Sequence, residues 1–270
     1  MCNSYLSSLN TLLQCLRNSL AILSLLIIFG ANVQAETLAI NTFGAPPLSN
    51  EQRTGFHDQL SITAFKRLGL DIIIPRLPAE RALINANKGI DDGDLPRISG
   101  LESIYNNLIM VPQSIMDYSF VAFTRHKNFK ITGWDSLKPY NVGIITGWKI
   151  LEKNVVGVRS LTKVKNQTQL FTLLQMDRTD VVIYEKWQGL QTARDMGIKD
   201  IKILQPPLSK RKMFMYLNKK HEHLVAKIAK TLTEMKEDGT YQKIFDKTLK
   251  PLNNNMWLQP EAPQIGKPVK

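Results

Sequence analysis

Short β-forming runs alternate with longer segments of helical period along most of this chain, and this alternation restricts the fold more than any other feature. The expected strands are residues 37–40, 70–74, 118–123, 140–145, 179–183, 201–204 and 212–217. The expected helices are residues 58–68, 78–88, 148–155, 168–176, 184–196, 222–236 and 240–249. Strands that alternate with helices predict an α/β protein whose sheets are mostly parallel and flanked by helices.

The expected elements divide into two α/β units, because a polar segment follows the strong expected strand that ends near residue 123. We expect a first lobe from residues 36–124 and 209–250, with a second lobe, residues 125–208, inserted into it. The chain then crosses between the lobes twice, near residues 123–126 and 205–209. Residues 251–270 contain four prolines and three successive asparagines, so we expect a flexible tail there.

Residues 20–30 form an unbroken run of apolar and small residues that is too short to span a bilayer, which needs about 20. Arg17 precedes this run, and a small-x-small pattern ends at Ala35. We therefore interpret residues 1–35 as a cleaved secretory signal peptide, with an uncleaved membrane anchor as the alternative. Export through this signal predicts a periplasmic location.

Both cysteines, Cys2 and Cys15, lie inside the expected signal peptide. The mature chain therefore has no disulfide and no cysteine-ligated metal. Neither cysteine ends the apolar run, as a lipid-anchored protein requires, so a soluble protein of a Gram-negative periplasm is favoured.

The net charge is +12, and removal of Arg17 with the signal leaves +11. Such a charge is compatible with an anionic partner such as nucleic acid. However, the basic residues are spread along the chain, and the densest group, residues 210–212, flanks an apolar strand rather than aromatic stacking positions. We expect a solvated basic surface and no nucleic-acid partner.

Residues 89–97 concentrate charge directly after an expected helix. We interpret the segment as a turn in which Asp91 and Asp92 are capping or turn residues, while Asp94 and Arg97 face a polar ligand. An ion pair between Asp94 and Arg97 is the alternative, and it would remove both from a ligand role.

Several short motifs together resemble a known family. They are GFHDQL at residues 55–60, PAERAL at 78–83 followed by Gly89, NVGI at 141–144 before Thr146 and Gly147, RTDVVI at 178–183, LNKK at 217–220 and DGT at 238–240. In order and spacing the chain resembles the periplasmic solute-binding proteins that capture polar amino acids for ABC transporters, the type II periplasmic binding proteins. The resemblance covers nearly all of the mature chain. It implies a two-lobed, monomeric protein that closes on a small polar solute and presents it to a membrane permease, or alternatively to a membrane sensor.

The resemblance also implies opposite partners for the two charged groups of an amino acid. Arg97 is the candidate for the solute carboxylate, because a guanidinium can form two parallel hydrogen bonds. The family's usual arginine lies slightly later, in a segment that here reads GLES at residues 100–103, so Arg97 is a proposed replacement. Thr146 and Gly147 offer further donors at a helix start, unless they form only a strand-to-helix turn.

Glu185 is the candidate for the solute ammonium group, because it follows Asp180 at the spacing of the family's second-lobe carboxylate. Asp94 is expected to assist from the first lobe. Among the aromatic residues near the expected cleft, Tyr118 and Trp148 are the best candidates to wall the solute. Arg81, in the first turn of its helix, either reaches the cleft or pairs locally.

The enzyme interpretation is the less favoured one. The four histidines are scattered and define no metal site or catalytic triad, and no phosphate-binding glycine motif occurs. We expect no cofactor and no metal. A dehydratase on the same fold, with Glu185 as general acid, is the remaining enzymatic alternative.

Overall fold

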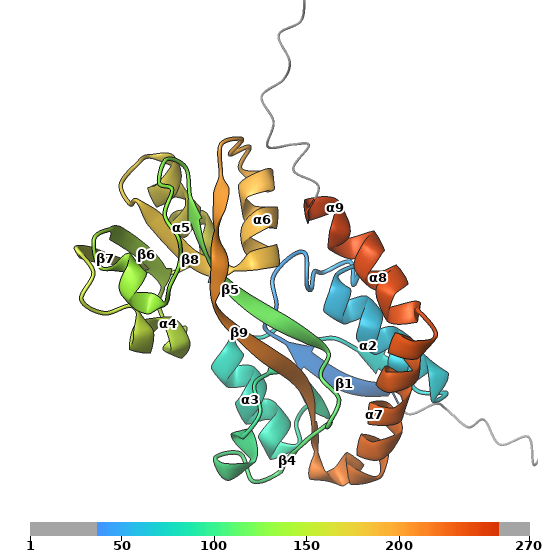
Figure 1. The fold of residues 1–270 in the computed structure, drawn as a ribbon. Coiled ribbons are helices and arrows are strands. Elements are labelled where there is room, and N and C mark those ends of the chain that lie inside the picture. Colours follow the sequence, from blue (N-terminus) through green and yellow to red (C-terminus); the bar gives the residue numbers. More distant parts are fainter. Residues whose placement is uncertain (1–36, 254–270) are drawn as a thin grey trace, which may run out of the picture. The chain divides into compact units, whose positions relative to one another are not determined.

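The computed structural model describes residues 37–253, and the expected signal peptide and most of the expected tail lie outside this range. The strands are β1 Thr37–Thr42, β2 Asp71–Ile73, β3 Gly93–Arg97, β4 Leu108–Met110, β5 Met116–Thr124, β6 Asn141–Ile145, β7 Ser160–Val164, β8 Val181–Glu185 and β9 Lys202–Asn218. The helices are α2 Phe56–Arg67, α3 Ala79–Lys88, α4 Lys149–Asn154, α5 Gln167–Gln175, α6 Lys186–Asp195, α7 Glu222–Glu237, α8 Thr240–Thr248 and α9 Lys250–Asn253, with short 3₁₀ turns at Leu101–Ser103, Trp134–Leu137 and Lys219–His221. The predicted α/β fold is confirmed (Figure 1).

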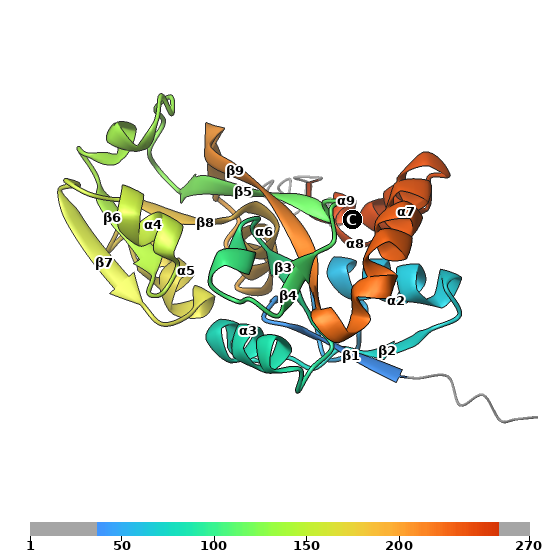
Figure 2. The same ribbon diagram turned by 90° about the horizontal axis from the view of Figure 1, so that it is seen from below.

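The strands follow the order β2-β1-β3-β9-β5-β8-β6-β7, and β4 pairs with β9 beside this path. β1 pairs in parallel with β2 and β3, and β6 pairs in parallel with β7 and β8. The two long strands β5 and β9 are antiparallel to each other and lie between these two parallel sets (Figures 1 and 2). The sheet therefore consists of two parallel sets of strands, β1 to β3 and β6 to β8, which are joined through β5 and β9.

A short stretch of β5 and β9 belongs to neither parallel set. Residues 117–119 of β5 pair only with residues 210–212 of β9, whereas β9 pairs with β3 from Phe214 onward and β5 pairs with β8 from Phe120 onward. We call this stretch the crossing strands. The lobe crossings expected from the sequence, near residues 123–126 and 205–209, lie outside this stretch. Residues 205–208 bulge out of β9 without interrupting it.

Residues 93–97 form strand β3 and not the expected turn, so this prediction is wrong. All five residues are buried, and β3 runs parallel to β1. Gly93 is required at its start, because a Cβ there would lie 2.6 Å from the Tyr216 carbonyl oxygen. Pro96 is tolerated because the pairing with β9 shifts register between Asp94 and Arg97.

Asp91 and Asp92 have structural roles before this strand. Asp92 accepts hydrogen bonds from the Ala39 backbone N–H at 2.7 Å and from the His221 imidazole at 2.7 Å, and it pairs with Lys220 at 2.6 Å. Asp91 accepts from the Asn41 side chain at 2.9 Å. The two carboxylates therefore join the start of β3 to β1 and to the end of β9.

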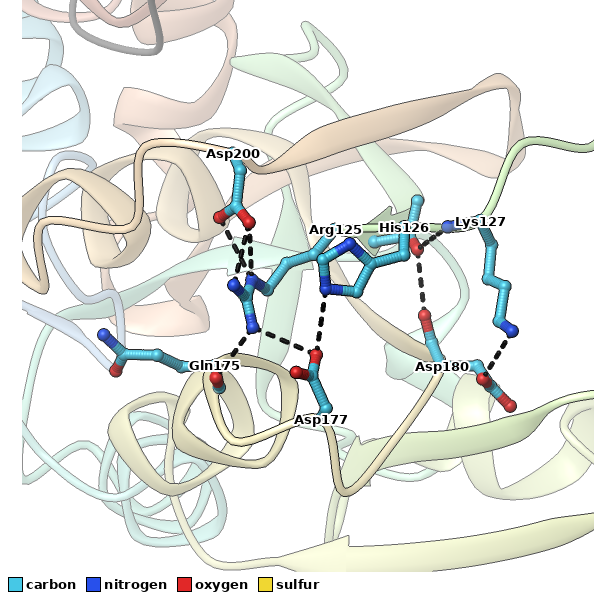
Figure 3. Close-up of polar contacts among 8 residues, drawn as sticks. Arg125, His126, Lys127, Gln175, Asp177, Asp180 and Asp200 are labelled. Atoms are coloured by element: carbon cyan, nitrogen blue, oxygen red, sulfur yellow. Dashed lines mark hydrogen bonds and ion pairs between the residues drawn. The ribbon is translucent and has the colours of Figure 1, made fainter. Parts of the chain in front are cut away.

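Arg125, directly after β5, holds together the far end of the second parallel set (Figure 3). Its guanidinium bonds both oxygens of Asp200, at 2.9 and 3.0 Å, and Asp177 at 3.0 Å. His126 and Lys127 add ion pairs to Asp177 and Asp180. Residues 125–127, where the sequence suggested a crossing, therefore fasten β5 to the segments that lead into β8 and β9.

Within residues 37–253, no helix is long and apolar enough to cross a membrane. The same residues contain no group of three histidine, cysteine, aspartate or glutamate side chains arranged for a metal ion. The first residues of the expected tail belong to α9, where Leu252 is buried.

Candidate functional site

Three predicted site residues lie on strands that meet at the crossing strands. Arg97 ends β3, which pairs with β9; Glu185 ends β8, which pairs with β5; and Tyr118 lies on β5 itself. Burial raises the pKa of Tyr118 well above its usual value, the charge of Glu185 raises it further and the charge of Arg97 opposes the shift. The charges of Arg97 and Glu185 both act on the Tyr118 phenol. We therefore treat Arg97, Tyr118 and Glu185 as one cluster.

Asp94 and Arg97 form the ion pair that the sequence left as an alternative. Arg97 Nε lies 2.5 Å from Asp94 Oδ2, Arg97 Nη2 donates to the Ala79 carbonyl at 2.7 Å, and the guanidinium lies 4.3 Å from the Phe43 ring centroid. These contacts leave only Nη1 of the guanidinium without a hydrogen bond to the described residues. Arg97 is held rigidly, with one nitrogen left for a solute.

Asp94 is fully buried, and its Oδ1 has no hydrogen-bond partner among the described residues. Burial raises the pKa of Asp94 to about 7, although Arg97 opposes the shift. A buried acceptor without a partner is costly, so a donor supplied by a ligand would stabilise it.

Glu185 begins helix α6 as well as ending β8. Its Oε2 accepts hydrogen bonds from the backbone N–H groups of Trp187 and Gln188, both at 2.9 Å. Its Oε1 is buried and has no partner among the described residues. Burial raises the pKa of Glu185 to about 7, against the effect of the two hydrogen bonds. One oxygen therefore fixes the side chain, and the other is a buried acceptor without a hydrogen bond to the described residues.

Thr146 and Gly147 do not offer the backbone donors that the sequence suggested. The Thr146 N–H donates to the Val164 carbonyl at 2.9 Å, and the Gly147 N–H donates to Glu152 Oε1 at 3.0 Å. Gly147 has a φ of +89°, which favours glycine at this turn. The geometry is that of the strand-to-helix turn, and only the exposed Thr146 hydroxyl remains for a ligand.

Trp148 packs beside the cluster, with ring centroids 4.9 Å from Tyr184 and 5.7 Å from Phe120. It is half-buried, so one part of the indole is accessible. Arg81 lies exposed on α3 and forms no hydrogen bond or ion pair with residues 37–253. The structure does not bring Arg81 into contact with the cluster.

His57 is the member of the cluster that the sequence analysis did not select. Its Nε2 lies 3.4 Å from the Tyr118 hydroxyl, and the two rings stack at 6.1 Å. Burial lowers the pKa of His57 to about 3, so the imidazole is neutral, and its Nδ1 has no partner among the described atoms. Its position in the GFHDQL motif at the start of α2 was the signal that could have identified it.

A cavity of about 510 Å³ lies on the same side of the crossing strands as Tyr118, and we call it the front cavity. Residues paired across antiparallel strands share a face, so Tyr118, Phe120 and Arg211 lie on one face. The cavity has an apolar floor that includes Phe120 and Met213, and its cationic rim is formed by Lys149, Lys153 and Arg211. An anionic group is therefore favoured here.

No protein-family model matches the chain. A curated relative, an uncharacterized protein from Shewanella oneidensis (strain MR-1), is 28% identical over 191 residues, which cover 67% of this chain and 70% of the relative.

Three solved structures are similar over most of the chain. The GluR0 ligand-binding core in complex with L-glutamate has a TM-score of 0.70 and 13% identity, covering 80% of this chain and 99% of that one. The substrate-binding protein of an amino acid ABC transporter has a TM-score of 0.63 and 19% identity, covering 80% and 100%. A histidine kinase sensor domain with similarity to periplasmic binding proteins has a TM-score of 0.66 and 14% identity, covering 80% and 96%.

These likenesses establish the fold. The chain has the fold of the type II periplasmic binding proteins, the class with two α/β lobes, as the motif resemblance predicted.

Proposed function

We propose that this protein binds a small polar solute, amino-acid-like in its charges, beside the crossing strands. The observation that carries the proposal is the buried carboxylate of Glu185, held by α6 through one oxygen and left without a partner at the other. A buried acceptor of this kind is stabilised by an ammonium group.

The carboxylate end of such a solute would lie near positively charged side chains. Arg97 Nη1 and the cationic rim of the front cavity offer partners for a carboxylate, and Trp148 and Tyr118 offer aromatic walls. The proposed solute-binding residues are Asp94, Arg97, Tyr118, Trp148 and Glu185, with His57 supporting Tyr118 and the Thr146 hydroxyl as a further donor.

We keep the two-lobe division as part of this proposal, with the first lobe before and after the crossing strands and the second lobe between them. Residues 117–119 and 210–212 are then the hinge, because they pair only with each other. Closure about this hinge would bring Arg97 and Glu185 against the solute from opposite sides.

Delivery to an ABC-type permease after export to the periplasm is the proposed biological role. A ligand-dependent contact with a membrane sensor is the second candidate, supported by the fold shared with a histidine kinase sensor domain. Both roles use the same closure and differ only in the partner that recognises it.

A thermal-shift screen of the mature chain against amino acids, organic acids, polyamines and sugars tests the binding proposal. A solute at 100 times its dissociation constant stabilises by about 2.7 kcal/mol. Glu185→Gln should weaken binding of an ammonium-bearing solute by about tenfold or more. Glu237→Gln, which removes an exposed carboxylate at the end of α7, is the matched control.

No stabilisation by any polar solute, or equal affinity in Glu185→Gln and Glu237→Gln, would contradict the proposal. Turnover of a stabilising ligand that is lost in Glu185→Gln would instead support the dehydratase alternative. Capture of a sensor ectodomain only in the presence of solute would favour sensing over transport.

A further inference from the structure

A second hollow, which we call the rear groove, lies on the other face of the crossing strands and has a volume of about 620 Å³. Its floor includes Asp117, Ser119 and Lys212. Asp117 pairs with Lys212 across the strands, so their side chains lie on the face opposite Tyr118 and Arg211. The rear groove is therefore separate from the proposed solute site.

One wall of the rear groove is aromatic and comes from two helices. Trp187 lies at the start of α6, and Tyr241 and Phe245 lie on α8. Trp187 and Phe245 contact each other edge to face with ring centroids 5.4 Å apart, so the three side chains form one aromatic wall. Such a surface suits a flat apolar body.

Three lysines lie around the aromatic side chains of the rear groove. Lys186, Lys212 and Lys236 line the groove, and Asp117 is the one acidic side chain in its lining. Lys186 lies 4.3 Å from the Trp187 ring centroid, and Lys236 donates to the Ser114 carbonyl at 2.7 Å. None of the three lysines forms an ion pair with a described residue.

Burial and like charges both disfavour the charged form of two lysines in the groove. Partial burial lowers the pKa of Lys186, the charge of Glu185 opposes this shift, and the neighbouring charge of Lys210 adds to it. Partial burial also lowers the pKa of Lys236, with Lys212 acting in the same direction and Asp117 against it. An anion between the lysines would relieve this repulsion.

We propose that the rear groove is a second binding site, which takes a small organic anion with a flat apolar body, such as an aromatic carboxylate or sulfonate. The lysines neutralise the acid group, and the apolar body lies against Trp187, Tyr241 and Phe245. Because α6 and α8 both contribute, a bound anion ties together elements on either side of the crossing strands.

Isothermal titration calorimetry of the mature chain with naphthalenesulfonate tests the site, with neutral naphthylmethanol and inorganic sulfate as partial ligands. We expect saturable binding of naphthalenesulfonate in the rear groove, and weaker binding of naphthylmethanol and of sulfate. Lys212→Ala and Lys236→Ala should each weaken this binding about three- to tenfold. Lys227→Ala is the matched control, because it removes the same charge from an exposed position of α7, the helix that carries Lys236, outside the lining of the groove, and it should leave binding unchanged.

No saturable binding to the unsubstituted protein would overturn the inference. So would an equal loss in Lys227→Ala and Lys212→Ala, which would mean non-specific attraction to a basic surface. If naphthylmethanol bound as strongly as naphthalenesulfonate, the lysines would contribute nothing to binding, and the inference would also be overturned. Tyr118→Phe, which removes no charge, should leave naphthalenesulfonate binding intact, so the rear groove and the proposed solute site can fail independently.

Discussion

Asp94 and Arg97 form a buried ion pair within a single strand, with Arg97 Nε 2.5 Å from Asp94 Oδ2. Buried pairs are weak contributors to stability as a unit, because desolvation offsets their attraction. The pair instead fixes the position of Arg97: Asp94 holds the guanidinium at the end of β3, over the Phe43 ring. The pair and a ligand role for Arg97 are therefore compatible, whereas the sequence analysis treated them as alternatives.

Arg97→Met should destabilise the protein, and the loss should increase above pH 7. Asp94 has a pKa of about 7 beside Arg97, so without the guanidinium it stays protonated at pH 7 and leaves no uncompensated charge. The loss at pH 7 should be about 1–3 kcal/mol, from the ion pair and the hydrogen bond to Ala79. Urea unfolding at pH 7 and pH 9 measures it. The double substitution Asp94→Asn with Arg97→Met should show no such increase, and an equal loss at both pH values in Arg97→Met would contradict the electrostatic role of the pair.

The stability of the protein should decrease as Glu185 ionises. Its pKa is raised to about 7 in the folded state from the model-peptide value of 4.5, so the folded state binds more protons than the unfolded state between these values. Stability contributed by this group is therefore present below pH 4.5 and lost as the pH rises through 7, by about 3 kcal/mol in total.

Glu185→Gln removes this titration, so the unfolding free energy of wild type relative to Glu185→Gln should fall between pH 4.5 and 7. Chemical denaturation at several pH values measures the difference. Parallel pH profiles for the two proteins would contradict a buried, titrating Glu185.

His57 should make the stability of the protein depend on pH in the opposite direction to Glu185, so that stability falls as the pH is lowered. Its pKa is lowered to about 3 in the folded state from 6.5, so the unfolded state binds more protons between these values. Stability contributed by the neutral imidazole is present above pH 6.5 and lost as the pH falls toward 3, by about 5 kcal/mol. His57→Gln should flatten the acid limb of the stability profile, while His223→Gln, at an exposed histidine, serves as the control. Similar acid limbs in both variants would count against the burial of His57.

The alternation of β-forming runs and helical segments was sufficient to predict the α/β fold, because hydrophobic period is a local property of the sequence. It did not reveal β3, since Asp94, Pro96 and Arg97 have poor strand propensity and are accommodated by an ion pair and a register shift. It also divided β9 into two strands, because Pro206 and Pro207 lie in a bulge that sequence does not distinguish from a loop. These features depend on partners distant in the sequence.

The sequence predicted only part of the geometry around the candidate site residues. Glu185 was proposed from its spacing, and its position as the cap of α6 depends on backbone geometry. Thr146 and Gly147 were chosen as backbone donors, yet Val164 and Glu152 accept from those donors. His57 joins the cluster through its contact with Tyr118, a residue 61 positions away in the sequence.

Arg125→Ala should destabilise the protein by about 1–2 kcal/mol, because it breaks a bidentate contact with Asp200 and the contact with Asp177 together. Arg125→Lys should recover only part of the loss, since an ammonium group cannot reproduce the planar fork. Thermal unfolding at low and high salt measures the effect, which should be smaller at high salt. Arg194→Ala, at an exposed arginine of α6, is the control, and an equal loss there would contradict a specific network.

Tyr118 and Ser119 are neighbours on β5 that face opposite sides of the crossing strands, and this alternation separates the two proposed sites. Tyr118→Phe removes a hydroxyl on the solute side, where its partner His57 lies at a long 3.4 Å, so the fold should lose less than about 1 kcal/mol. Solute affinity should fall about fivefold, the equivalent of one hydrogen bond, while naphthalenesulfonate affinity should be unchanged. Ser119→Ala should leave solute affinity unchanged. Calorimetric titration of each variant with the solute and with naphthalenesulfonate measures the four affinities. A Tyr118→Phe variant that lost only naphthalenesulfonate binding would reverse the assignment of the two faces.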